Sequence, residues 1–287
     1  MDLPVPHMMV FLGGAVLFAG VVALIAGGRG GRFRGLVGWS GFWVGFGVVL
    51  VILARTPPLV AIPVLGLVMA GALRAFFVLA PVRAKDRYAI LAAYLSVPAA
   101  LLPVFHNADQ AFLAFVPATL ILGIPVLLSF GSTHDGLLDS TGRILLGTAF
   151  FVFCTAHLGL LVHQPDGRIE LFGILVLAAE LPQRLAGRPR SGGGIVRPVL
   201  GYAVGAGAAM VAGWMLAPWV GMTARHGSLV GLAVALAAIA GGLVADAIAD
   251  DLQLGTRSTI VGRASLLNRF APVLYAAPVY FHALALL

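Results

Sequence analysis

The sequence predicts an all-α membrane protein with about ten transmembrane helices, and three observations indicate this class. Sixty per cent of the 287 residues are hydrophobic, only 10% are charged, and the mean hydropathy is +1.02. Apolar runs of about 20 residues, the length that crosses a bilayer, recur along the whole chain. These runs are continuous, as in "GVVLVILA", whereas the strands of a membrane barrel alternate apolar and polar residues. We therefore expect one transmembrane domain over 1–287, with N-terminal helices to about residue 165 and a distinct C-terminal part from about residue 166.

Six spans are expected in the N-terminal part. The first, at 7–27, comes before its basic residues Arg29, Arg32 and Arg34, whereas a cleaved signal peptide carries such residues ahead of its apolar run. We therefore expect an uncleaved helix whose N-terminus lies outside. The next five spans are expected at 35–54, 58–80, 88–105, 110–130 and 143–163.

Four spans are expected in the C-terminal part, at 169–186, 199–221, 228–250 and 269–287. Pro182 should kink or end the first of these helices, because proline lacks the N–H that continues the ladder of hydrogen bonds. The segment 187–198, "GRPRSGGGIVRP", is rich in glycine and arginine. It is either a flexible connector or a backbone that closely approaches a ligand.

Basic residues are distributed unequally between the two sides that this topology creates. Fifteen of the 18 Lys and Arg residues follow odd-numbered spans, and the three exceptions are Arg55, Arg168 and Arg225. Cytoplasmic loops carry the excess of Lys and Arg, so the loops after odd-numbered spans should be cytoplasmic. The formal charge of +7 then reflects topology and contact with anionic lipid headgroups of the cell membrane, and not nucleic-acid binding.

Charged residues inside apolar runs are costly, so each one requires a reason. Glu180 lies near the inner end of 169–186, and Asp246 and Asp250 lie one turn apart at the inner end of 228–250. The two aspartates either hold a divalent cation together with phosphate oxygens, or they meet water and arginines at a helix end. His157 is expected to be a packing residue, and the single cysteine, Cys154, cannot form an intrachain disulfide.

The C-terminal part resembles the phosphatidate cytidylyltransferase (CDP-diacylglycerol synthase) family in the order and spacing of its segments. "LFGILVLAAELPQRLAGR" is similar to the family's apolar run that ends in an acid, a Gln and a Gly-Lys pair, here Glu180, Gln183, Gly187 and Arg188. "IVRPVLGYAVGA" resembles its Lys-Thr-Trp-Glu-Gly stretch, with Arg197 for the Lys. "GRASLLNRFAPVLYAAPVYFH" resembles the C-terminal signature, in which only Arg269 matches a signature side chain.

The departures from the family pattern fall on its chemistry. Arg263 begins the stretch that stands for His-Gly-Gly, and Asn268 and Ala271 stand where the signature has acids. Asp246 and Asp250 lie where the family has a Ser and a basic residue. The resemblance implies a dimer that transfers a cytidylyl group from CTP to a lipid phosphate, releasing pyrophosphate, with Mg²⁺ held by carboxylates.

Three functions follow as expectations. The first is CTP-dependent transfer to a phospholipid or another lipid phosphate at the cytoplasmic face, with Glu180, Asp246 and Asp250 as catalytic residues and the two aspartates as metal ligands. The second is a catalytically inactive protein of the same fold that binds lipid or regulates a partner. The third is a small-solute transporter, since prolines within spans allow broken helices. For the first function, the expected substrate-binding residues are Gln183, Arg188, Arg197, Arg263, Asn268 and Arg269. For the second, the residues expected to bind an anionic headgroup or nucleotide are Arg188, Arg190, Arg197, Arg263 and Arg269.

Overall fold

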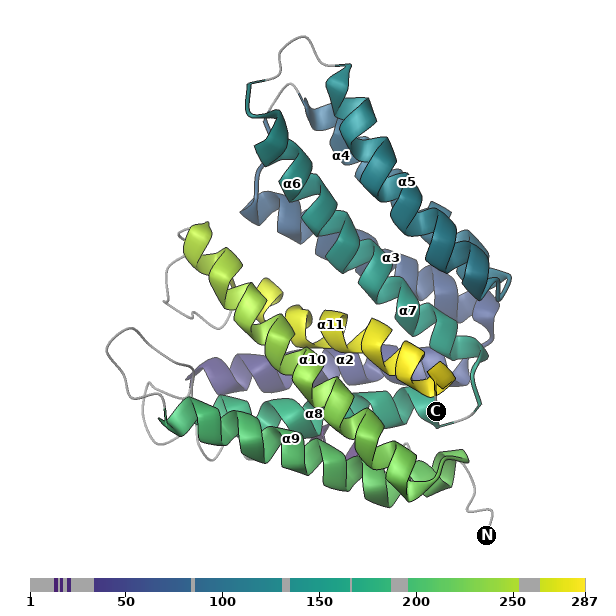
Figure 1. Ribbon diagram of the computed structural model, residues 1–287, viewed down its shortest axis with the longest axis vertical. Coiled ribbons are helices and arrows are strands. Elements are labelled where there is room, and N and C mark those ends of the chain that lie inside the picture. Colours follow the sequence, from purple (N-terminus) through teal and green to yellow (C-terminus); the bar gives the residue numbers. More distant parts are fainter. Residues whose placement is uncertain are drawn as a thin grey trace. The chain divides into compact units, whose positions relative to one another are not determined.

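The computed structural model describes residues 13–14, 16–17, 20–21, 34–83, 86–130, 135–165, 167–186, 196–252 and 264–286, without the side chains of 34–37, 115, 197 and 264–266. The described chain is built from helices and contains no strand, which confirms the predicted all-α class (Figure 1). It divides into two compact units, one formed by Met1–Arg55 with Gln164–Leu287 and the other by Thr56–His163.

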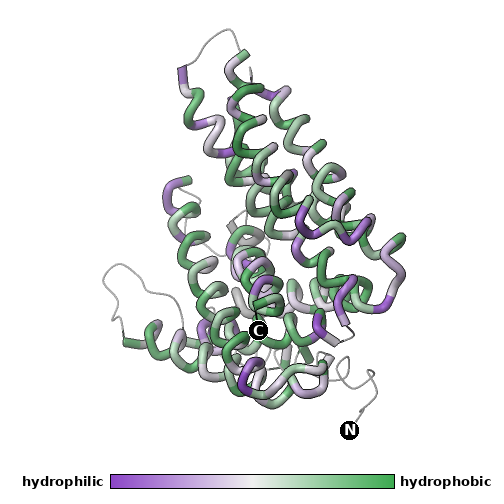
Figure 2. Tube along the Cα trace, turned by 45° about the vertical axis from the view of Figure 1, so that its right-hand side comes forward, coloured by the Kyte–Doolittle hydropathy of each residue, from purple (hydrophilic) through white to green (hydrophobic). Residues whose placement is uncertain are grey.

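Seven helical segments among the described residues are long and apolar enough to cross a membrane. They are Gly38–Arg55, Pro58–Leu79, Arg87–Phe105, Asp109–Ser129, Leu137–His163, Pro198–Val220 and Ala224–Asp251, and each corresponds to an expected span. Most of the expected span 7–27 lies outside the described residues. In the remaining two, 169–186 and 269–287, the described residues are helical but do not meet the same requirement for an apolar stretch. Figure 2 shows hydrophobic residues along most of the helices, with hydrophilic residues concentrated toward helix ends.

The unit Thr56–His163 is a bundle in which α3 (Pro58–Leu79), α4 (Arg87–Phe105), α5 (Asp109–Ser129) and α6 (Leu137–Thr148) pack against their neighbours. Polar contacts hold one end of this bundle. Arg83 forms an ion pair with Asp86, which is 2% exposed. The Nε of Arg83 also donates to Ser140 Oγ at 2.9 Å. Gly136, with φ of 71°, begins α6 beside the Arg83 guanidinium. These contacts tie the start of α4 to the start of α6.

A π-helix at Ala149–Cys154 continues α6 and is followed by α7 (Thr155–Leu160) and the short 3₁₀ turn η4 (Leu161–His163). Its wide turns free backbone carbonyls, and polar side chains bind two of them. Thr155 Oγ1 donates to Phe150 O at 3.3 Å, and His157 Nδ1 lies 2.9 Å from Phe153 O. The His157 ring is fully buried and edge-on to Phe112, 5.1 Å away. These contacts agree with the packing role expected for His157.

In the other unit, α8 (Arg168–Ala186) is the central helix, and it packs against α2 (Arg34–Arg55), α9 (Val196–Leu216), α10 (Ala224–Asp251) and α11 (Ala264–Leu286). A short 3₁₀ helix, η5 (Ala217–Val220), connects α9 to the segment before α10. Almost every residue of α8 from Ile169 to Glu180 is buried. The prediction was that Pro182 would kink or end this helix; the helix continues through Pro182 to Ala186, so the proline does not end it.

Two glycines allow backbones of neighbouring helices to approach closely. Gly205 of α9 faces the carbonyl oxygen of Ala179 on α8, and Gly241 of α10 faces the carbonyl oxygen of Ala271 on α11. A Cβ atom at either position would overlap that oxygen. Small residues at helix interfaces permit such contact, which is a main source of helix association within membranes. These two approaches bring the four helices together around the polar side chains described next.

Candidate functional site

The site begins with a buried carboxylate on α8. Glu180 is 2% exposed, and its Oε2 accepts hydrogen bonds from two indoles of α2, Trp39 Nε1 at 2.7 Å and Trp43 Nε1 at 3.1 Å. The two tryptophans lie one helical turn apart, so that both rings reach the same oxygen. Their centroids are 6.4 Å apart in an edge-on arrangement. A buried charge is stable only when donors replace its hydration, and the indoles supply two of them.

Arg184 is the cation of the site. It follows Glu180 by one turn of α8, and its Nη2 lies 3.4 Å from Glu180 Oε1. The same nitrogen donates to the backbone carbonyl of Asn268 on α11 at 2.7 Å. Arg184 therefore links α8 to α11, and its contact with the carboxylate is the longer of the two.

A second guanidinium lies near Arg184. Arg269, on α11, directly follows Asn268, whose carbonyl accepts the hydrogen bond from Arg184, so both arginines lie where α8 contacts α11. Two like charges held near each other repel, and an anion between them relieves that repulsion. The planar guanidinium also matches the geometry of phosphate oxygens. The pair is therefore suited to binding an anionic group.

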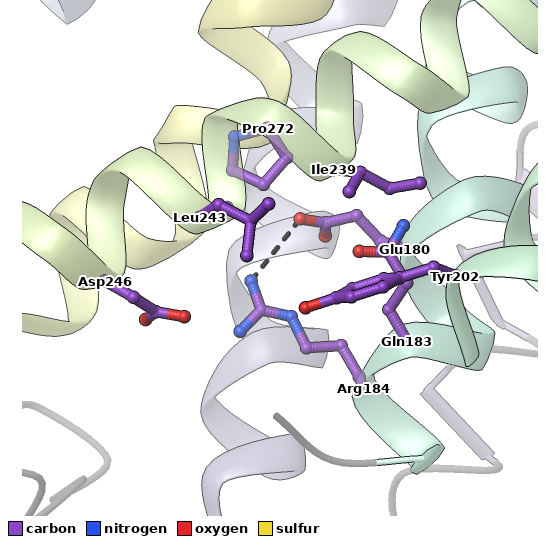
Figure 3. A pocket seen from close by; sticks show the side chains of 9 residues that line it. Glu180, Gln183, Arg184, Tyr202, Ile239, Leu243, Asp246 and Pro272 are labelled. Atoms are coloured by element: carbon purple, nitrogen blue, oxygen red, sulfur yellow. Dashed lines mark hydrogen bonds and ion pairs between the residues drawn. The ribbon is translucent and has the colours of Figure 1, made fainter. Parts of the chain in front are cut away.

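A cavity of about 20 Å³ opens beside these residues, between α8, α9, α10 and α11. Its polar lining comes from Glu180, Gln183, Arg184, Tyr202 and Asp246. Figure 3 shows the Asp246 carboxylate, from α10, directed toward the side of the cavity where the Arg184 guanidinium lies. Tyr202 lines the cavity from α9 (Figure 3). This volume accommodates one water-sized group with several polar neighbours.

Known proteins give no guide to this site. No protein-family model, curated protein or solved structure matches the chain. The chemistry of the side chains is therefore what points to a function.

The structure brings together five of the residues predicted from the sequence. Glu180, Gln183 and Asp246 line the cavity, while Asn268 and Arg269 are connected to it through Arg184. Gln183 Nε2 donates to the Ala179 carbonyl at 2.8 Å, a bond within α8.

Of the other four predicted residues, the structure describes the side chain of one. Asp250 is exposed at the end of α10 and is not part of the cavity lining. Arg188 and Arg263 lie outside the described residues, and Arg197 is described only as part of the α9 backbone. Their predicted role in substrate binding stays a prediction.

The carboxylates of the site differ in how well they fit a divalent cation. Within the described ranges, no group of three or more His, Cys, Asp and Glu side chains is placed to hold a metal ion. Glu180 already accepts two indole hydrogen bonds and faces Arg184, so its oxygens are engaged. Asp246 is the other carboxylate that lines the cavity. Mg²⁺ can bind through one or two carboxylates and substrate phosphates, so the expectation for Asp246 and Asp250 stays a prediction.

Several site residues were missed by the sequence predictions. The sequence predicts only that Trp39 and Trp43 lie in a span and that Arg184 is one of the basic residues on the cytoplasmic side, and it predicts no role for Tyr202. One signal was present in the sequence, because Trp39 and Trp43, and likewise Glu180 and Arg184, are four residues apart and share a helix face. Nothing in the sequence indicated that α2 would face α8.

Proposed function

We propose that this protein is a multi-pass membrane protein that binds the phosphate of a phospholipid or another lipid phosphate at the cytoplasmic face. The observation that carries the proposal is the placement of Arg184, which lines a small cavity together with other polar side chains and donates to the carbonyl of Asn268, the residue before Arg269. Seven apolar helices provide the membrane setting.

The place of the site along the helices supports a headgroup ligand. Glu180 and Arg184 are in the last two turns of α8, Asp246 is near the end of α10, and Arg269 is in the second turn of α11. Of these helices, α10 is one of the seven apolar segments, and the ends of spanning helices reach the headgroup level, where arginines meet lipid phosphates. The excess of basic residues in the same connecting segments favours the cytoplasmic face.

The proposal is consistent with a divergent relative of the phosphatidate cytidylyltransferases, which we retain as part of it. Binding is the activity that the described side chains support best, because the buried acid of α8 is engaged by indoles and arginine. CTP-dependent nucleotidyl transfer is the second candidate. It is favoured by Asp246, whose carboxylate is directed into the cavity beside Arg184 (Figure 3).

Binding is tested with purified protein in detergent and dioctanoyl phosphatidic acid, with dioctanoylglycerol as the ligand that lacks phosphate. We expect saturable binding of phosphatidic acid only, weakened at least about tenfold in Arg184→Ala/Arg269→Ala, since charge-assisted hydrogen bonds are the strong ones. Arg225→Ala is the matched control, because Arg225 is an exposed arginine of the same unit at the opposite end of α10. Equal binding by the double variant would overturn the proposal.

The transfer reaction is tested separately with labelled CTP and a panel of lipid phosphates, with and without Mg²⁺. Formation of a cytidylylated lipid together with pyrophosphate would establish the second candidate. Binding without product would leave lipid binding as the function.

A further inference from the structure

The two carboxylate oxygens of Glu180 have different hydrogen-bond partners. Oε2 receives both indole hydrogen bonds, at 2.7 and 3.1 Å, whereas Oε1 faces Arg184 at 3.4 Å. An ideal ion pair between arginine and carboxylate is shorter, about 2.7–2.9 Å, and often uses two parallel bonds. Glu180 is therefore held in a geometry that gives Arg184 a nearby counter-charge without a close, two-pronged pair.

Packing keeps the indoles in this position. Trp39 is 1% exposed and Trp43 is fully buried. The Trp43 ring contacts Phe42 and Phe46 edge-on, with centroids 6.0 and 5.8 Å away, and Phe42 in turn meets Phe270 of α11 at 4.9 Å. Edge-on aromatic contacts of this kind have a preferred geometry, and the contact between Phe42 and Phe270 connects α2 to α11. The indole N–H groups of α2 are thus directed at Glu180 by contacts independent of Arg184.

We infer that Trp39 and Trp43 are positioning residues that hold Glu180 back from Arg184, so that Glu180 is a resident counter-ion which the phosphate of a ligand displaces. This inference rests on the proposed lipid-phosphate binding and explains how that site is kept available. With the indoles holding Oε2, the ligand has to replace only the long contact at Oε1. Arg184 keeps its bond to the Asn268 carbonyl, which orients its guanidinium in both states.

Removal of the indole N–H groups should draw Glu180 and Arg184 closer together. Phenylalanine keeps most of the ring and lacks the donor, so Glu180 would lose two hydrogen bonds in a buried place. Arg184 would remain as the charged donor in contact with the carboxylate, and Glu180 would turn both oxygens toward it. The closer pair would compete with phosphate for the guanidinium.

The test measures the affinity for dioctanoyl phosphatidic acid in four proteins: wild type, Trp39→Phe/Trp43→Phe, Glu180→Gln, and the triple variant with all three changes. We expect the double variant to bind about tenfold more weakly, as loss of hydrogen bonds to a charged group implies. Glu180→Gln should bind more tightly than wild type, because the competing charge is gone. The triple variant should regain at least the wild-type affinity.

Rescue by the glutamine separates positioning from packing. If the indoles only fill space, the triple variant would bind as weakly as the double variant, and that result would overturn the inference. Weaker binding by Glu180→Gln than by wild type would also overturn it, since Glu180 would then be needed to orient Arg184. If the double variant does not yield folded protein, the single variants Trp39→Phe and Trp43→Phe are measured in its place. Adding Glu180→Gln to either single variant should then restore at least the wild-type affinity.

A spectroscopic measurement gives a second readout. The chain has four tryptophans, and Trp214 and Trp219 are 59% and 39% exposed. In Trp214→Phe/Trp219→Phe the emission comes from Trp39 and Trp43, whose hydrogen-bonded partner is Glu180. Phosphatidic acid should shift this emission, and the shift should disappear with Arg184→Ala; an unchanged emission during saturable binding would contradict the inference. If wild type does not bind phosphatidic acid, the proposed function is refuted. If wild type binds it but the triple variant does not regain the wild-type affinity, only the role of the indoles is refuted.

Discussion

Arg55, the last residue of α2, forms an ion pair of 2.9 Å with Glu170 in the first turn of α8. Glu170 and Glu180 are therefore both buried on one helix, each facing an arginine, about 15 Å apart along the axis at 1.5 Å per residue. The side chain of Arg55 is 28% exposed and that of Glu170 is 1% exposed. The two partners should consequently respond differently to substitution.

Arg55→Ala should lower the free energy of unfolding more than Glu170→Gln. The first change leaves a buried carboxylate without its ion pair, whereas the second leaves an arginine that can reach water. Breaking a fully buried pair costs about 3–5 kcal/mol, and the partial exposure of Arg55 reduces this to about 1–3 kcal/mol. Thermal unfolding in detergent, followed by circular dichroism, measures both variants. A larger loss for Glu170→Gln would contradict this account.

Gly205→Val should prevent α9 from packing against α8, because its side chain would overlap the Ala179 carbonyl. Gly207→Val is the matched control, since Gly207 is on the same helix and a Cβ atom added to it would have no neighbouring heavy atom within 4 Å. We expect a lower unfolding temperature and loss of phosphatidic acid binding for the first variant only. Overpacking of this kind typically costs about 1–3 kcal/mol. Equal stability of the two variants would show that the close approach is not needed.

If the second candidate function applies, Asp246→Asn should reduce Mg²⁺-dependent release of pyrophosphate at least about 100-fold, because metal-bound charge stabilisation is worth several kcal/mol. Asp250→Asn should reduce it as well if both carboxylates bind the ion. Asp251→Asn is the control, being an exposed neighbour at the end of α10. Activity that survives Asp246→Asn would exclude this aspartate as the metal ligand.

The predicted topology places residue 193, which lies outside the described residues, on the cytoplasmic side. In a Cys154→Ala background, Gly193→Cys should react with a membrane-impermeant maleimide only in inside-out vesicles. His106→Cys, in the exposed turn after α4, should react only from the opposite side. The reverse pattern would invert the topology and move the proposed site to the outer leaflet.

The helices and their class could be predicted from the sequence because hydropathy over about 20 residues is a local property. Seven expected spans correspond to apolar helices in the structure. Helix α8 departs from this pattern. Its run was expected to be a span like the others, yet it carries four charged residues, at 168, 170, 180 and 184, and two of them are acids buried by partners on other elements.

The site was only partly predictable, because its contacts join residues that are far apart in the chain. A carboxylate in an apolar run is costly, so Glu180 was recognised as a residue that requires partners. Its indole donors are 141 and 137 residues away in the chain, and no spacing rule connects such distant positions. Asp246 and Asp250 share a helix face by spacing, but only the structure shows that one lines a cavity and the other is exposed.

The π-helix at Ala149–Cys154 has a consequence for how the chain tolerates changes in length. A π-helical turn contains one residue more than an α-helical turn, so removing one residue there would restore a regular helix while the neighbouring helices keep their rotational register. A deletion elsewhere in α6 or α7 would instead rotate every following side chain by about 100°. This segment is therefore the place within its span where a shortened variant of the chain is easiest to accommodate.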